Sequence, residues 1–275
     1  MTPAHAHDRA PQAGADDAPP VIEIQDLCVT LDRNEILRDI ALTIRSGEYL
    51  SIVGPNGAGK STLIRCLAGL CAEWGGRIRI GDRDLRDFSG RQRARIMSYV
   101  PQAQERTLPF TVHEFVMMGR YPHLSPFTSC RPEDEKAVQN ALETTGVTAL
   151  RHRIVDTLSG GERQNVYIAA ALAQQARILI LDEPATFLDY RHQREVMDTI
   201  RDVNRNTGNT VITVNHNINS AVAASHRILA LKRGRVAFLG SAADIMQTDT
   251  LNDIFDTRFR FIHDALRDQP LVVAE

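Results

Sequence analysis

The sequence lacks the features that mark several large classes of protein. Its 275 residues carry a formal net charge of -2, which gives no global electrostatic basis for binding nucleic acid. No apolar run approaches the roughly 20 residues that a membrane-spanning helix needs. The four cysteines, Cys28, Cys66, Cys71 and Cys130, form no C-x-x-C pair and match no zinc-ligand spacing. We therefore expect no disulfide framework and a reducing compartment.

The N-terminus also lacks the basic-then-apolar order of a secretory signal peptide. We expect a cytoplasmic protein, and any link to a membrane would run through a partner. The first 20 residues are rich in Ala, Pro, Asp and His, so residues 1–20 are predicted to be a disordered tail. His5 and His7 could bind a metal ion, but two histidines in a flexible segment make a weak site, and a solvated spacer is the default interpretation.

One glycine-rich segment lies between a predicted strand, Tyr49–Val53, and a helix-like run over residues 63–70. It fits the pattern G-x-x-x-x-G-K-[ST], in which backbone N–H groups surround a phosphate chain at a helix N-terminus. Its residues are Gly54, Pro55, Asn56, Gly57, Ala58, Gly59, Lys60, Ser61 and Thr62. We interpret the segment as a phosphate-binding loop rather than a turn without a ligand. Lys60 would reach the β- and γ-phosphates, and Ser61 would reach Mg²⁺.

The remaining pattern predicts an α/β fold. The stretch from about residue 88 to 158 is mostly helix-like and lies between strand-like segments, so we expect an inserted helical subdomain. The main domain is predicted to cover residues 21–260, and residues 261–275 to be a loose C-terminal tail. The predicted strands occupy residues 21–24, 40–44, 49–53, 77–80, 96–100, 178–181, 210–214, 227–231 and 235–240.

Polar residues follow two of the most apolar strands. Asp182 and Glu183 end the run over residues 178–181, where two adjacent carboxylates are unfavourable unless a cation or a reaction uses them. His216 follows the strand over residues 210–214, at the edge where α/β sheets bind ligands. A further helix start combines a capping box with two glycines, which makes it a second place where N–H groups could meet an anion. It reads Leu158-Ser159-Gly160-Gly161-Glu162.

These motifs together resemble the nucleotide-binding subunits of ATP-binding-cassette (ABC) transporters, from about Val21 to Phe255. Five motifs match in order: the phosphate loop 54–62, Gln102, the signature 158–162, the strand 178–183 with its acids, and His216. The resemblance implies a P-loop NTPase fold with a RecA-like core, an antiparallel β subdomain and an inserted helical subdomain. It also implies ATP hydrolysis coupled to transmembrane transport.

The resemblance implies a role for each matching residue. Lys60 and the loop N–H groups would hold the phosphates of ATP. Ser61 and Gln102 would ligate Mg²⁺, and Asp182 would support the ion through a water molecule. Glu183 is the expected general base that polarises the attacking water, and His216 the expected contact to the γ-phosphate.

The same resemblance implies a second copy of the chain. Ser159, Gly160 and Gly161 would face the ATP of that copy in a head-to-tail dimer, and Asp189 would lie in a loop that crosses the interface. Polytopic membrane permease subunits are the further implied partners, and this chain would lie peripherally at the cytoplasmic face of the inner membrane. A periplasmic or lipoprotein substrate-binding protein would be an indirect partner.

Two stretches resemble the importers of iron–siderophore, haem and cobalamin. They are residues 99–102 with 111–112 and 119–123, and the loop 215–219, where an Asp is commoner than Asn217. We expect Arg120–Phe127 to lie near the surface that docks on the membrane subunits; a surface loop without a partner is the alternative. The family usually stacks adenine on an aromatic residue at the position of Leu31, so nucleotide binding should be weaker or less base-selective here.

Three other functions compete with the importer subunit. A soluble cassette ATPase acting on nucleic acid or ribosomes usually carries two cassettes, a long coiled coil or a basic surface, and this chain has one phosphate loop and no heptad run. A regulatory module without turnover is disfavoured by the presence of Gln102, Glu183 and His216. An exporter subunit stays open, and the sequence does not indicate the cargo.

Overall fold

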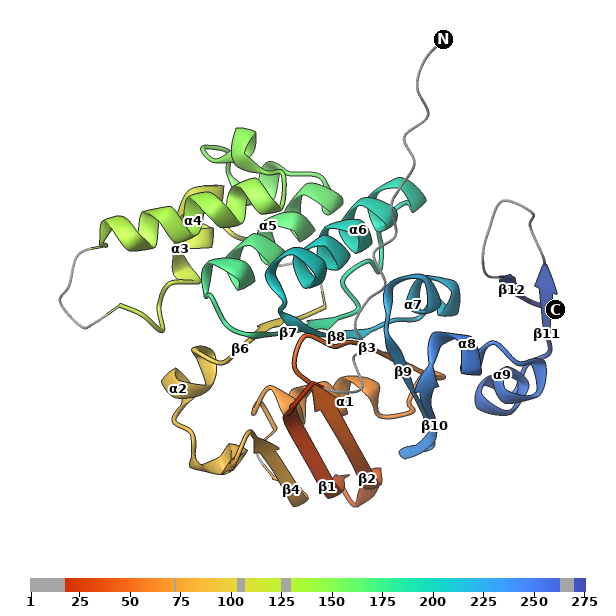
Figure 1. Cartoon of the computed structure of the whole chain (residues 1–275). Coiled ribbons are helices and arrows are strands. Elements are labelled where there is room, and N and C mark those ends of the chain that lie inside the picture. The colour runs from red at the N-terminus through yellow and green to blue at the C-terminus, as the bar shows by residue number, and fades with distance from the viewer. Residues whose placement is uncertain (1–17, 72, 103–106, 125–129, 263–269) are drawn as a thin grey trace, which may run out of the picture.

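The computed structural model describes residues 18–71, 73–102, 107–124, 130–262 and 270–275. Its centre is a six-stranded sheet (Figure 1). Five strands are parallel and β10 is an antiparallel edge. Strands β3, β7 and β8 are buried along their whole length, as their continuous apolar sequences require for strands covered on both faces. In spatial order the strands are β10 (Arg235–Ser241), β9 (Arg227–Lys232), β3 (Tyr49–Val53), β8 (Thr210–Val214), β7 (Ile178–Asp182) and β6 (Met97–Val100).

A second, antiparallel sheet lies below the first in Figure 1, with α1 (Lys60–Leu67) between them. Leu63 and Ile64 of α1 belong to one apolar core together with residues of both sheets, such as Ile22 and Ile180. This packing fixes the start of α1 at the end of β3. The second sheet has the order β2 (Asn34–Arg45), β1 (Pro20–Leu31), β4 (Gly75–Ile80) and β5 (Arg83–Asp84), and the short helices η2 (Leu85–Asp87) and α2 (Gly90–Ala94) follow it in the chain.

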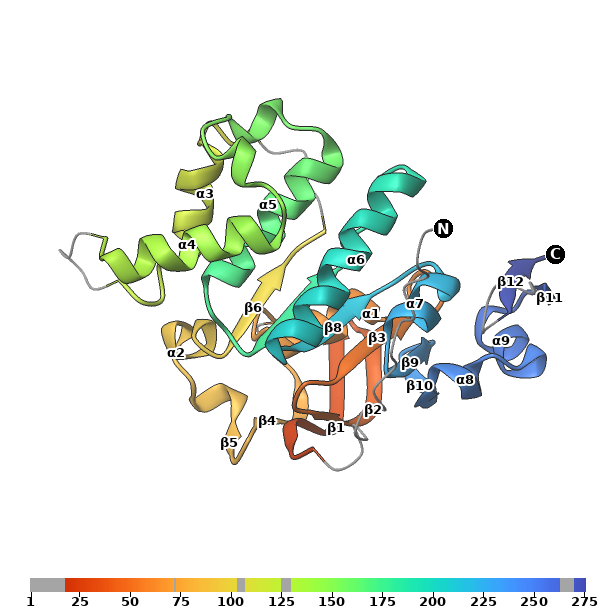
Figure 2. The same cartoon turned by 45° about the horizontal axis from the view of Figure 1, so that its top comes forward.

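The helical part differs from the expected range of residues 88–158. Strand β6 lies inside that range but belongs to the main sheet, and a 14-residue helix of the group begins only after residue 158. One face of α5 packs on α3 and α4, and its other face packs on the main sheet and α6. Figure 2 shows α3, α4 and α5 grouped at one end of the molecule. The helices here are α3 (Val112–Met118), α4 (Pro132–Thr144), η3 (Thr148–Leu150), η4 (Val155–Thr157), α5 (Gly160–Ala173) and α6 (Tyr190–Thr207).

The C-terminal end is ordered where a loose tail was expected. Strand β11 (Phe259–Ile262) pairs with β12 (Leu271–Ala274) in a small antiparallel sheet. Val272 is buried in an apolar cluster with α7 (Ile218–Ala224), α8 (Ala242–Ile245) and α9 (Thr248–Phe255). The prediction of a loose tail over residues 261–275 is therefore wrong for these strands, because a four-residue strand has too little pattern to show its distant partner.

The expected N-terminal tail lies outside the described residues as far as residue 17. Its last residues contact β2, where the Ser46 N–H donates to the Pro19 carbonyl at 3.0 Å. None of the helices in the described part of the chain is long and apolar enough to cross a membrane.

A buried ion pair joins the helices of the helical part. Arg120 Nε donates to Asp134 Oδ1 at 2.9 Å, and Arg120 Nη1 donates to the Ala173 carbonyl at 2.7 Å. Each residue of the pair is only 4% exposed. Burial acts to raise the pKa of Asp134, but hydrogen bonds from Arg131 and Arg120, together with the Arg120 charge, lower it overall. Arg120, expected in a docking loop, thus ties α3 to α4 and α5.

We predict that Asp134→Asn destabilises the protein at pH 7 by about 3–5 kcal/mol, because Arg120 stays buried without its counter-charge. The lowered pKa means that the carboxylate contributes fully above its unfolded pKa of about 4, and that this contribution is lost as the pH falls through the folded pKa. The difference in free energy of unfolding between the two proteins should therefore shrink at acidic pH. Urea denaturation across the range in which both fold cooperatively measures it. Asp202→Asn, at an exposed position of α6, is the control, and a pH-independent difference would contradict the prediction.

Candidate functional site

The segment 54–62 connects β3 to α1, and its glycines are required by close approaches. Gly54 has a φ of 139°, and a Cβ there would lie 2.1 Å from the Leu231 carbonyl oxygen. Gly59 has a φ of 99°, and a Cβ there would lie 2.9 Å from the Ile36 carbonyl oxygen. The loop is therefore held between the β9–β10 hairpin and the start of β2, in a conformation that L side chains rarely adopt.

Lys60 lies folded inside this loop. Its Nζ donates to the carbonyl oxygens of Gly54 at 2.8 Å and Pro55 at 3.0 Å, and the residue is 5% exposed. Burial lowers the pKa of Lys60, and the negative charges of Glu183 and Asp182 oppose that shift. A cation at the opening of a glycine loop on a helix N-terminus is suited to hold an anion.

Asp182 ends β7 beside the start of α1. The Ser61 hydroxyl donates to Asp182 Oδ1 at 3.2 Å, and the Tyr99 phenol donates to Oδ2 at 3.2 Å. The pKa of Asp182 is raised, chiefly because burial disfavours the charged form. Burial and the Asp182 charge also raise the pKa of Tyr99 to about 12, so its phenol keeps its proton.

Glu183 lies at the centre of a polar cluster. Gln102 Nε2 donates to Glu183 Oε2 at 2.7 Å, the Thr186 hydroxyl donates to the same oxygen at 3.2 Å, and His216 Nε2 contacts Oε1. The backbone of Glu183 has a φ of 52°, which is unfavourable for a residue other than glycine. The strand order places β6, β7 and β8 side by side, so the residues that follow them meet at one edge of the sheet.

The oxygen donors at this edge fit Mg²⁺. Ser61, Gln102 and Asp182 offer a hydroxyl, an amide and a carboxylate oxygen, and Mg²⁺ is usually held by one or two carboxylates together with waters and substrate phosphates. No group of three or more His, Cys, Asp or Glu residues that could hold a metal occurs among the described residues. The set thus suits an ion that arrives with a phosphate chain rather than one in an all-protein cage.

The signature residues lie elsewhere. Ser159 caps α5 in a capping box with Glu162, whose Oε2 accepts from the Ser159 N–H at 2.8 Å. A Cβ on Gly161 would lie 2.9 Å from His192 Cβ, and Asp189 caps α6 by accepting from the His192 N–H at 2.9 Å. Ser159 and Gly161 line a cavity of about 360 Å³, whereas Glu183 and His216 line a different one of about 410 Å³. The structure therefore brings one part of the expected site together and leaves the signature apart from it.

Leu31 ends β1, opposite Asn34 across the hairpin turn, and is 51% exposed. The start of β2 contacts the phosphate loop, since Ile36 lies against Gly59. Leu31 therefore lies in the hairpin whose second strand contacts the loop, and no aromatic ring stands at this position.

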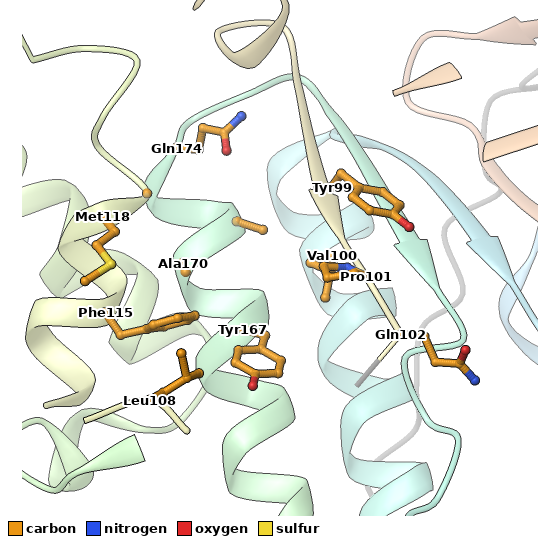
Figure 3. Close-up of a pocket in the computed structure, with 12 residues that line it drawn as sticks. Tyr99, Val100, Pro101, Gln102, Leu108, Phe115, Met118, Tyr167, Ala170 and Gln174 are labelled. Carbon is orange, nitrogen blue, oxygen red and sulfur yellow. The ribbon is translucent and has the colours of Figure 1, made fainter. Parts of the chain in front are cut away.

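An apolar groove of about 360 Å³, which no sequence pattern indicates, lies beside the end of β6 (Figure 3). The segment Arg120–Phe127 begins next to it; Tyr121 in this segment is 76% exposed, and residues 125–129 are outside the described part. A Cβ on Gly119 would lie 2.1 Å from the Ala170 carbonyl oxygen, so α3 approaches α5 closely here. The groove is lined by Tyr99, Val100, Pro101, Gln102, Leu108, Phe115, Met118, Gly119, Tyr167, Ala170, Ala171 and Gln174.

Sequence reasoning also missed Tyr99 and Thr186 as neighbours of the two acids. Tyr99 was seen as part of a strand next to Gln102, but only the pairing of β6 with β7 puts its phenol against Asp182. Thr186 lies three residues after Glu183, and its hydroxyl donates to the Glu183 carboxylate.

Comparison with known proteins places this geometry in a family. The family model described as ABC transporter matches residues 37–186. The chain is 36% identical to the iron(3+)-hydroxamate import ATP-binding protein FhuC of Bacillus subtilis, over 86% of this chain and 88% of that protein. It is also 36% identical to the ferric enterobactin transport ATP-binding protein FepC of Escherichia coli, over 90% of this chain and 92% of that protein.

Solved structures agree with the fold. The structure of a protein assigned to the metal-chelate type of ABC transporter, in an inward-facing conformation, superposes with a TM-score of 0.82 at 24% identity and covers 94% of this chain and 98% of that chain. The ATP-binding cassette MJ0796, dimeric in a post-hydrolysis state bound to ADP and Pi, superposes with a TM-score of 0.70 at 26% identity, over 80% of this chain and 98% of that chain. The chain therefore belongs to the ABC transporter family, with the P-loop ATPase fold of its ATP-binding subunits.

Proposed function

We propose that this chain is the ATP-hydrolysing subunit of an importer for a metal chelate such as an iron–siderophore, haem or cobalamin. The main support for this proposal is the cluster around Glu183, where Gln102 and His216 contact a carboxylate that is 9% exposed. The similarity to proteins named for iron(3+)-hydroxamate import and ferric enterobactin transport supports the cargo class.

In this proposal each residue acts by position and charge. Lys60 and the loop N–H groups bind the β- and γ-phosphates of ATP, and bound Mg²⁺ would neutralise charge on the phosphates. Ser61 and Gln102 would ligate the ion, and Asp182 would hold one of its waters. Glu183 accepts a hydrogen bond from the attacking water, and His216 contacts the γ-phosphate. Glu183 is only 9% exposed, which keeps competing water away from its carboxylate.

The completed site takes its second part from another copy. The signature residues Ser159 and Gly161 line a cavity separate from that of Glu183, and a head-to-tail dimer would bring Ser159, Gly160 and Gly161 over the nucleotide of the partner. Asp189 caps the start of α6 and would lie at the dimer interface. Phe187 and Tyr190 beside it are 82% and 89% exposed, as residues of an unpaired interface would be.

The groove beside β6 is the proposed docking site for the permease. It is bounded by the strand that leads to Gln102 and by α3 and α5, so an inserted segment would touch both the sheet and the helical part. Its lining is mainly apolar and aromatic, and Met118 at its rim is 47% exposed. The protein would then be a peripheral subunit at the cytoplasmic face of the membrane, linked only indirectly to a substrate-binding protein.

The docking proposal predicts the outcome of co-purification from membranes. Expressed with the genes that neighbour its own, the tagged chain should recover a polytopic membrane protein. Met118→Glu should lower that recovery by about tenfold, the effect of ~1.4 kcal/mol of lost binding. Leu70→Glu puts the same charge on an apolar residue that is 59% exposed and not part of the groove lining, so it serves as the control. Recovery without any membrane protein would contradict the proposed function, and full recovery with Met118→Glu would contradict the docking site.

The dimer proposal predicts complementation between two inactive chains. Lys60→Ala disables the phosphate loop, and Ser159→Arg disables the signature. Each variant alone should lack ATPase activity, whereas an equal mixture would form dimers with one intact composite site and regain up to about a quarter of the activity. Phosphate release measures turnover, and thermal unfolding checks that both variants fold. If each site were complete within one chain, mixing would restore nothing.

The adenine proposal predicts a gain of affinity at Leu31. Leu31→Tyr should tighten ATP binding about fivefold or more, because base–aromatic stacking contributes roughly 1–3 kcal/mol. Competition against a fluorescent ATP analogue gives the affinity, and GTP measured in parallel shows the change in base preference. Leu31→Met, which keeps an apolar side chain without a ring, is the control. An unchanged ATP affinity in Leu31→Tyr would show that the base does not lie at this position.

A further inference from the structure

Tyr99 contacts two sites that the chain keeps apart in sequence. Tyr99 belongs to the lining of the apolar groove, but its ring lies on the side of β6 away from Phe115 and Tyr167 and packs on the core beneath the main sheet (Figure 3). Its phenol donates to Asp182 Oδ2 at 3.2 Å. The residue thus borders the groove while its side chain forms part of the surroundings of the proposed metal site.

The carboxylate that Tyr99 holds has little freedom. Asp182 is 2% exposed, and a buried carboxylate requires hydrogen-bond donors for its oxygens. The Ser61 hydroxyl supplies a donor to Oδ1 at 3.2 Å, and Tyr99 supplies the donor to Oδ2. Ser61 is itself a proposed ligand of Mg²⁺, whereas Tyr99 is not. Tyr99 lies on a strand of the main sheet, and Arg65 is a second neighbour of its phenol that acts to lower the Tyr99 pKa.

We propose that Tyr99 is a positioning residue for the magnesium–nucleotide site, fixing the Asp182 carboxylate so that Oδ1 faces Ser61. This inference rests on the proposed function, because it assumes that ATP binds at the phosphate loop with Mg²⁺. Terminal carboxylate torsions are broad, so Asp182 without its second donor can turn away from Ser61. Groups that orient metal-binding side chains typically contribute 10- to 100-fold to metal affinity or activity.

A simpler role for Tyr99 is packing alone, with the phenol merely satisfied by a nearby acid. The two roles differ in what they do to metal binding. Loss of packing would weaken nucleotide binding whether or not Mg²⁺ is present. Loss of positioning would weaken only the Mg²⁺-dependent part, since Tyr99 acts through Asp182 and not through the phosphate loop.

The experiment uses Tyr99→Phe, which keeps the ring and its packing and removes only the O–H. It is carried out in the full chain with Glu183→Gln, so that ATP persists during the titration. We expect the Mg²⁺ concentration that gives half-maximal ATP binding to rise about 10- to 100-fold. ATP affinity in EDTA should not change, and thermal unfolding should show that the variant folds.

A double-mutant cycle with Asp182→Asn completes the test. If Tyr99 acts through Asp182, Tyr99→Phe should have no further effect on the Mg²⁺ requirement once Asp182 is replaced. An unchanged Mg²⁺ requirement in Tyr99→Phe, an equal loss of ATP affinity in EDTA, or full additivity in the cycle would each overturn the inference. Failure of the proposed function looks different: the parent chain would then bind no ATP with Mg²⁺ present.

Discussion

The structure depends on placing two carboxylates at the end of a strand that is buried on both faces. Asp182 ends β7, whose other residues are apolar and fully buried, and Glu183 follows it. Burial disfavours their charge, so each needs donors or a cation close by. Tyr99 and Ser61 donate hydrogen bonds to Asp182, and Gln102 and Thr186 donate hydrogen bonds to Glu183.

This constraint explains the arrangement of the neighbouring elements. The donors come from β6 and the segment after it, from α1, and from the loop after β7. The strand order and the position of α1 together bring them to the same edge of the sheet. Helix α1 is held from below by the antiparallel sheet, and the glycine loop is held between two hairpins. A change in any of these contacts would move the lysine of the loop relative to the acids.

The helical part is connected to this edge by the groove. Helix α5 packs on α3 and α4 with one face and on the main sheet and α6 with the other, and the buried Arg120–Asp134 pair makes the three helices one unit. A partner that fills the groove would contact this unit and the strand that carries Tyr99 and Gln102. The geometry thus offers a short physical path between a docked segment and the carboxylates, with the capped start of α5 at the other end of the same helix.

The sequence by itself determined the phosphate loop, the two acids, the signature and the family, because each depends on local spacing and on glycine or charge at fixed positions. Only the tertiary structure decided which distant residues meet. The phenol of Tyr99 reaches Asp182 because β6 pairs with β7, and Arg120 is buried because α3, α4 and α5 enclose it. The pairing of β11 with β12 and the membership of α5 in the helical part were likewise settled by packing. Such contacts join residues far apart in the chain, so no local periodicity records them.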